Sequence, residues 1–139
     1  MRATRSFVAR FGRRGIFLLF LTLLDALYAL NLARPLPEAR QTPATAYISH
    51  VLPLPVWAAM WAFVGIVCAI GAFLRRDQWA FACAMALKVL WSLTFLFGWI
   101  FYGLPRGWVS GIIWLAFAAF VYLISTWPED GVDLRRRER

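Results

Sequence analysis

Residues 15–33 read GIFLLFLTLLDALYALNLA, an apolar run that a single acidic residue, Asp25, interrupts near its middle. An α-helix needs about 20 mostly apolar residues to cross the hydrocarbon core of a bilayer, so this run is long enough to do so. Together with three further apolar runs, it defines predicted spans at residues 15–33, 55–74, 79–101 and 108–126. We therefore predict an all-α integral membrane protein whose membrane domain, residues 15–126, is a four-helix transmembrane bundle.

The composition of the whole chain supports this class. Of its 139 residues, 62% are hydrophobic and 16% are charged, whereas soluble domains average about 45–50% apolar and about 25% charged residues. A chain this short has too little interior to bury such a surplus of apolar side chains. The composition thus argues against a soluble globular domain, and the same hydrophobicity argues against a disordered chain.

Arginine residues are distributed unevenly between the two sides of the predicted bundle. One side holds Arg2, Arg5, Arg10, Arg13, Arg14, Arg75, Arg76, Arg135, Arg136, Arg137 and Arg139. The opposite side holds only Arg34, Arg40 and Arg106. Because Lys and Arg in short loops concentrate on the cytoplasmic side of a membrane, we predict that both termini are cytoplasmic.

The two terminal segments carry most of this charge. Residues 1–14 combine an apolar helical face with five arginines, which are expected to contact the anionic inner leaflet: Arg2, Arg5, Arg10, Arg13 and Arg14. A pure orientation signal is the simpler interpretation of this segment, and nucleic acid is not expected as a partner. Residues 127–139 are predicted to form a charged, solvated cytoplasmic tail.

A shorter helix is predicted between the first two spans, at residues 43–52. Thr42 suits the N-cap and Pro43 the first helical position. The apolar positions recur with helical spacing, at Ala44, Tyr47, Ile48, Val51 and Leu52. We expect an interfacial amphipathic helix on the outer face of the membrane.

Asp25 and Lys88 are the only charged residues inside the predicted spans. At 1.5 Å of helix rise per residue, each lies about 14–15 Å from the cytoplasmic surface. Opposite charges at equal depth are expected to form an intramembrane ion pair. Neighbouring residues are expected to form its supporting polar face: Thr22, Tyr28, Ser92 and Trp91, with Trp91 placed for a cation–π contact.

Two interpretations of this pair stay open. A structural ion pair would determine which helices meet, and this is the interpretation we favour. A functional pair would serve as a proton or ion relay, or as a latch that opens on oligomerisation, because intramembrane ionisable residues commonly mark functional sites.

Small residues in the second span predict close helix packing. They recur at steps of four and three, at Ala58, Ala62, Gly65, Ala69 and Ala72. Such a seam packs against another helix, either of the same chain or of a second copy. Cys68 and Cys83 lie at similar depths on adjacent spans and are expected to stay reduced.

The sequence lacks the common catalytic and metal-binding motifs. It contains no HExxH, P-loop, GxSxG or CxxC pattern, and His50 is its single histidine. We therefore expect no enzymatic activity, no metal site and no cofactor. The expected partners are the bilayer, a second copy of the chain, or another membrane or envelope protein.

Four local strings resemble sequences of small four-span membrane proteins of actinobacteria and their phages. They are residues 57–65 (WAAMWAFVG), 87–91 (LKVLW), 106–110 (RGWVS) and 124–129 (ISTWPE). The resemblance implies a multi-pass protein of a bacterial inner (plasma) membrane with a holin-like role, in which the membrane is permeabilised so that lysis enzymes escape. The alternatives are a membrane anchor or superinfection-exclusion module acting through a protein partner, and a small transporter or channel using Asp25 and Lys88.

Overall fold

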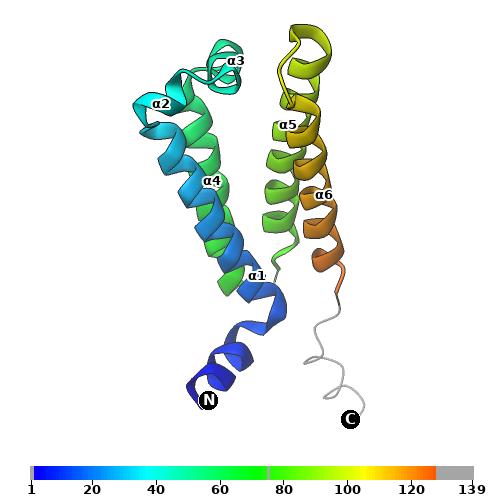
Figure 1. The fold of residues 1–139 in the computed structure, drawn as a ribbon. Coiled ribbons are helices and arrows are strands. Elements are labelled where there is room, and N and C mark those ends of the chain that lie inside the picture. The colour runs from blue at the N-terminus through cyan, green and yellow to red at the C-terminus, as the bar shows by residue number, and fades with distance from the viewer. Residues whose placement is uncertain (1, 75, 128–139) are drawn as a thin grey trace.

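The computed structural model describes residues 2–74 and 76–127, with the backbone alone for residues 2–11. Within these ranges the chain forms six helices (Figure 1): α1 (Arg2–Ala33), α2 (Pro37–Arg40), α3 (Pro43–Val51), α4 (Leu54–Phe73), α5 (Gln78–Tyr102) and α6 (Gly107–Ser125). Four of them contain segments long and apolar enough to cross a membrane: Gly12–Ala33, Leu54–Phe73, Gln78–Tyr102 and Gly107–Ser125. The prediction of an all-α protein with four helices of transmembrane length is confirmed.

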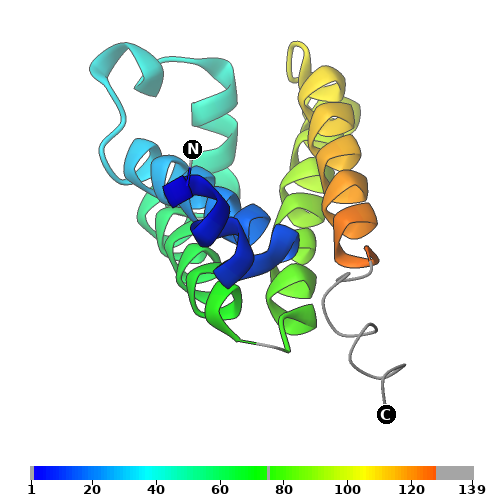
Figure 2. The ribbon, with the colours of Figure 1, turned by 90° about the horizontal axis from the view of Figure 1, so that it is seen from below.

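The four long helices form two antiparallel pairs, α1 with α4 and α5 with α6, which are joined where α4 packs against α5 (Figures 1 and 2). The start of α1, the α4–α5 turn and the end of α6 lie at one end of the bundle, called here the terminal end. Helices α2 and α3 and the α5–α6 turn lie at the other, called the far end. Helices α1 and α5 therefore run parallel to each other.

A single glycine separates the N-terminal segment from the first span. Gly12 has φ 65° and ψ 172°, a conformation outside the helical region, and the chain turns sharply there (Figure 1). Glycine tolerates positive φ because it has no Cβ atom. The predicted amphipathic face of residues 1–14 depends on side chains that lie largely outside the described residues, as do Arg75 and residues 128–139 of the predicted tail.

Helix α3 begins as the sequence predicts, with the Thr42 hydroxyl accepting a hydrogen bond from the backbone N–H of Thr45 at 3.2 Å. Its residues Tyr47 and Ile48 are buried against the bundle. The Tyr47 hydroxyl donates a hydrogen bond to the carbonyl oxygen of Thr94 in α5 at 3.1 Å. These contacts attach α3 to the far end of α5.

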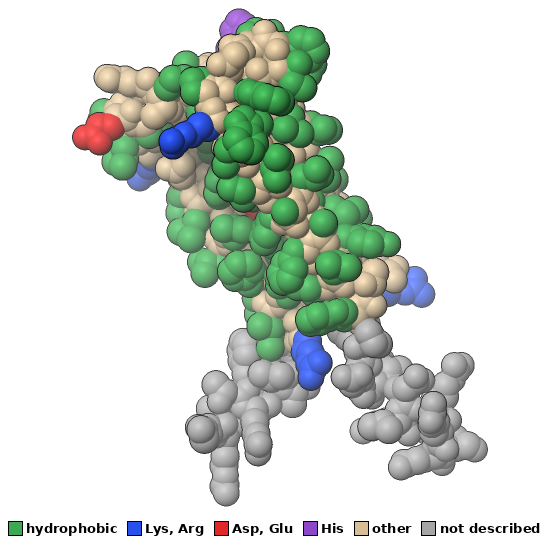
Figure 3. Space-filling model, turned by 45° about the vertical axis from the view of Figure 1, so that its right-hand side comes forward, with side chains coloured by type: hydrophobic (Ala, Val, Ile, Leu, Met, Phe, Trp, Pro, Cys, Tyr) green, Lys and Arg blue, Asp and Glu red, His purple; other side chains and the backbone are tan. Residues whose placement is uncertain are grey.

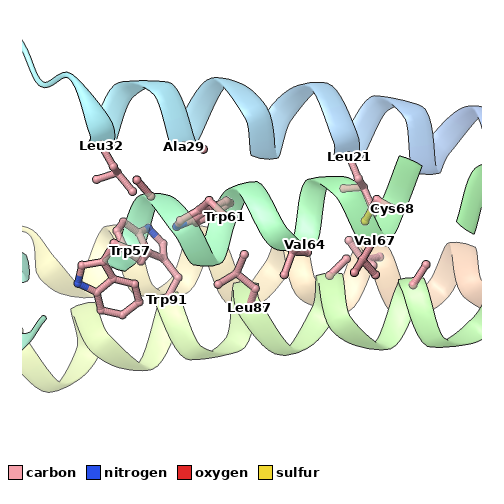
Figure 4. Close-up of a cluster of buried hydrophobic side chains, with 14 of the residues drawn as sticks. Leu21, Ala29, Leu32, Trp57, Trp61, Val64, Val67, Cys68, Leu87 and Trp91 are labelled. Carbon is pink, nitrogen blue, oxygen red and sulfur yellow. The ribbon is translucent and has the colours of Figure 1, made fainter. Parts of the chain in front are cut away.

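Large hydrophobic side chains occur both inside the bundle and on its surface. The buried core includes a group of tryptophans, Trp57, Trp61 and Trp91, contributed by α4 and α5 (Figure 4). Hydrophobic side chains also cover the middle of the face seen in Figure 3, while most of the charged side chains lie toward the two ends. A surface of this kind suits contact with lipid, because soluble monomers rarely expose large contiguous apolar patches.

Candidate functional site

Asp25 of α1 and Lys88 of α5 meet inside the bundle. The Lys88 ammonium donates a hydrogen bond to Oδ1 of Asp25, and both side chains are 0% exposed. The pair joins helices that belong to different antiparallel pairs, and both residues lie well inside their helices. Because both side chains are fully buried, water does not solvate the charges separately, and they neutralise each other instead.

Gly65 of α4 makes room for this pair. A Cβ atom on Gly65 would lie 3.3 Å from Cβ of Asp25 and 3.5 Å from the carbonyl oxygen of Thr22, so the backbone of α4 runs directly beside α1 at this level. The small-residue seam of α4 therefore faces α1 at Gly65. Its other members are buried at Ala58 and Ala72 and half-buried at Ala62 and Ala69.

Aromatic rings surround the ammonium group. Nζ of Lys88 lies 4.8 Å from the ring centroid of Trp61, a cation–π contact. Tyr28 of α1 stacks on Trp61 of α4, with ring centroids 4.5 Å apart. The ring of Trp91 meets that of Trp61 edge-on, with centroids 5.4 Å apart. Trp61 therefore makes the cation–π contact that the sequence predicted for Trp91. Trp61 reaches Lys88 from the facing helix α4, whereas Trp91 lies on α5 together with Lys88.

Two polar atoms of this centre have no hydrogen-bond partner among the described residues. They are Oδ2 of Asp25 and Nε1 of Trp61, one an acceptor and the other a donor. A buried polar atom without a partner costs about 1–3 kcal/mol. The centre therefore contains one acceptor and one donor that no described protein group satisfies.

The hydroxyl groups assigned to the polar face do not reach the pair. The Thr22 hydroxyl donates to the carbonyl oxygen of Leu18 in its own helix at 2.9 Å. The Ser92 hydroxyl donates to the carbonyl oxygen of Gly111 in α6 at 2.6 Å. Ser92 therefore joins α5 to α6, and of the predicted polar face only Tyr28 and Trp91 lie in the aromatic surroundings of the pair.

A second ion pair lies at the terminal end. Arg14 of α1 donates a hydrogen bond to Asp77, which precedes α5, at 2.6 Å, and their side chains are 14% and 9% exposed. The Arg14 guanidinium also lies 5.2 Å from the ring centroid of Phe81. Sequence reasoning assigned Arg14 to the inner leaflet and passed over Asp77. The sequence spacing was a usable signal for this second pair. Asp77 follows Arg14 by 63 residues, the same separation as between Asp25 and Lys88.

The two ion pairs share one face of each helix. Arg14 and Asp25 are separated by 11 residues on α1, and the same interval separates Asp77 from Lys88. Eleven residues make about three helical turns, or about 16 Å, so both partners on each helix point in the same direction. The order of the charges is reversed: α1 supplies the cation at the terminal end and the anion inside the bundle.

The remaining predicted site residues are placed as follows. Arg13 is exposed, and the side chains of Arg2, Arg5 and Arg10 lie outside the described residues. Cys68 is buried and Cys83 half-buried, and both thiols are free. Within residues 2–74 and 76–127, no group of three or more His, Cys, Asp or Glu side chains is arranged to hold a metal ion.

Comparisons with protein-family models, with curated proteins and with solved structures find no match to this chain. The features that bear on function are therefore the two described ion pairs and the four long apolar helices.

Proposed function

We propose that this chain is a small, non-enzymatic, holin-like integral membrane protein, which permeabilises a bacterial inner membrane after self-association. The observation that carries the proposal is the Asp25–Lys88 pair. Two full charges are held in the middle of an apolar bundle, and they come from helices of different pairs. In this proposal the pair holds α1 against α5 in the monomer, its structural role, and also acts as the latch between the α1–α4 and α5–α6 pairs when copies associate.

The edge between α1 and α6 is the place where the bundle opens. Contacts across it include two aromatic ones, Phe17 with Phe120 at 5.8 Å and Tyr28 with Trp114 at 5.1 Å. Between these contacts lies a groove of about 480 Å³ with an entirely apolar lining. The opposite edge is much more closely packed, because a Cβ atom on Gly71 of α4 would lie only 2.4 Å from Cβ of Ala80 in α5.

The energetics favour a closed monomer and an open assembly. A charge at the centre of a bilayer costs about 2.5–3.5 kcal/mol even on insertion scales, so separating Asp25 from Lys88 in lipid is unfavourable. Several opened copies can direct both charges into a shared aqueous lumen, where each is solvated. Because pores need a polar lining or a gated constriction, the separated pair supplies what the apolar helices lack.

Orientation belongs to the same proposal. The excess of arginine at the terminal end supports a cytoplasmic location for both termini. Helix α3 then lies at the outer face, where its exposed side meets the membrane surface. The inner leaflet, a second copy of the chain or another envelope protein are the partners in this arrangement.

The test is induced expression of the full chain in a bacterial host, followed with a membrane-potential dye. Wild type is expected to cause abrupt, lethal depolarisation after a period of accumulation. The Asp25→Asn/Lys88→Met double variant, which keeps an uncharged interior, is expected to accumulate without depolarising cells. Asp77→Asn is the matched control, since it removes a charge at the terminal end and is expected to keep the lethal effect.

Other outcomes of these experiments identify other functions. Healthy cells that resist phage infection would replace the proposal with a superinfection-exclusion module. Purified resting protein in liposomes is expected to give only background ion flux. Robust proton flux that depends on Asp25 would instead assign a transporter, and would overturn the latch.

A further inference from the structure

Two adjoining pockets lie where α3 crosses α5 at the far end. The larger, of about 470 Å³, lies between the two helices, and the smaller, of about 290 Å³, extends toward the α5–α6 turn. Three residues line both of them: Tyr47, His50 and Tyr102. Volumes of about 300–1,000 Å³ with mostly apolar and aromatic walls are typical of small-molecule sites.

The chemistry of the walls selects an uncharged ligand. Among the residues that the structure describes, no Lys, Arg, Asp or Glu lines either pocket. The Tyr47 hydroxyl is already committed to the carbonyl oxygen of Thr94, and its burial, together with the neighbouring Tyr102 phenol, raises the pKa of Tyr47, so it stays a neutral donor. The polar groups left for a ligand are the His50 ring and the Tyr102 hydroxyl, which both can donate hydrogen bonds.

The larger pocket also opens toward the lipid-facing side of α5. Leu93 and Phe97 line it, and they are 54% and 52% exposed on a helix of transmembrane length. Tyr47 and Thr94 at its floor are each only 9% exposed. A ligand therefore enters from the bilayer, with its apolar part along α5 and its polar part at the rim beside His50.

We infer that this pocket binds a neutral isoprenoid quinone of the membrane. Its ring packs against the aromatic side chains of Tyr47, Phe97 and Tyr102, which favour a flat ring over an acyl glycerol. The quinone carbonyl oxygens accept hydrogen bonds from His50 and Tyr102, and the isoprenoid tail follows Leu93 along the lipid-facing side of α5. This inference is independent of the latch, since the site lies on α3 and α5 and does not include Asp25 or Lys88.

Binding is tested with purified full-length protein in lipid nanodiscs, titrated with a naphthoquinone that carries a short isoprenoid chain. The expected result for wild type is a saturable rise in the thermal unfolding midpoint. Tyr102→Phe and His50→Ala each remove one hydrogen-bond donor from an exposed position, so we expect about fivefold weaker binding for each, the effect of losing one ordinary hydrogen bond.

A filling variant gives the steric test. Leu93→Trp places a larger side chain in the pocket and is expected to abolish saturable binding. Leu123→Trp on α6 is the matched control, because it makes the same change at a similarly exposed position outside the pocket, and it is expected to bind as wild type does. Equal binding by Leu93→Trp and wild type would mean partition into lipid alone and would overturn the site.

The identity of the ligand is tested in the same nanodiscs. Diacylglycerol and phosphatidylglycerol, added in place of the quinone, are expected to leave the unfolding midpoint unchanged. A saturable shift with either lipid that Leu93→Trp removes would overturn the quinone assignment in favour of a lipid site. The failure of quinone binding would leave the depolarisation experiment unaffected, so the two proposals fail separately.

Discussion

The two ion pairs between α1 and α5 have the same partners in kind and spacing but opposite surroundings. Asp25 and Lys88 are completely buried between helix pairs, whereas Arg14 and Asp77 lie at the terminal end with part of each side chain exposed. At the terminal end, where the two side chains are 14% and 9% exposed, a charge that loses its partner needs only a small movement to reach water. Inside the bundle, a charge that loses its partner stays buried. The depth of each pair, rather than its pairing geometry, therefore determines how much it contributes to the free energy of unfolding.

The buried pair gives the largest expected effect. Lys88→Met or Asp25→Asn alone leaves one buried group without its partner, and we expect a loss of about 3–5 kcal/mol in the free energy of unfolding. The double variant is expected to be much closer to wild type, because a charge-free interior needs no compensation. Unfolding measured in detergent, with the single and double variants compared, gives the coupling energy. Additive losses would show that the charges act separately.

The contact between α4 and α5 gives the next effect. Gly71→Ala would place a Cβ atom 2.4 Å from that of Ala80, close to the start of α5 and hence to the Asp77 pair. We expect this overpacking to cost about 1–3 kcal/mol. Gly71→Ala/Ala80→Gly moves the methyl group from one helix to the other and is expected to recover most of the loss. Failure to recover would assign the effect to the helices individually rather than to their contact.

The pair at the terminal end is expected to contribute less. Arg14→Gln or Asp77→Asn should lower the free energy of unfolding by about 1–2 kcal/mol, since the side chains are 14% and 9% exposed and the released partner needs only a small movement to be hydrated. The contribution should shrink further in high salt, because partly exposed charges are screened. Unfolding measured at low and high salt separates the pairs: salt should change the effect of Asp77→Asn and leave that of Lys88→Met unaltered. Equal salt dependence would contradict the contrast in burial.

The smallest effect concerns the two thiols, which probe depth without altering either pair. Cys68 and Cys83 lie in apolar surroundings of α4 and α5 and are free. Alkylation in denaturant without reductant should label two thiols per chain in mass spectra. In the folded protein, buried Cys68 should react more slowly than half-buried Cys83. A stoichiometric disulfide would contradict either the redox argument or the proposed orientation.

The helical scaffold and the depth of its charges follow from the sequence, while the rotation of each helix does not. Four apolar runs predict the four long helices, with boundaries within one residue except at the first span, which begins at Gly12 rather than residue 15. Rise per residue alone places Asp25 level with Lys88. Which ring faces Lys88 depends on rotation about the helix axis, so Trp61 was not distinguished from Trp91 in advance.

The second pair was missed for a related reason. Arg14 lies next to a basic segment whose charges follow the positive-inside pattern, and that pattern explains an arginine without requiring a partner. Asp77 lies in the connection between two spans, where an acidic residue needs no explanation. Their spacing matches that of Asp25 and Lys88, but the path of the chain, which brings the start of the first span beside the start of α5, is what shows that they are neighbours.

The reversed order of charges along α1 and α5 makes the contact between these two helices depend on their relative direction. With the two helices parallel, Arg14 meets Asp77 and Asp25 meets Lys88. If α1 were inserted upside down, Arg14 would face Lys88 and Asp25 would face Asp77, and both encounters would be repulsive. The same rejection applies to α1 of a neighbouring copy that approaches α5 in the wrong direction. Two charge pairs thus encode the direction of a helix, which an apolar surface by itself does not specify.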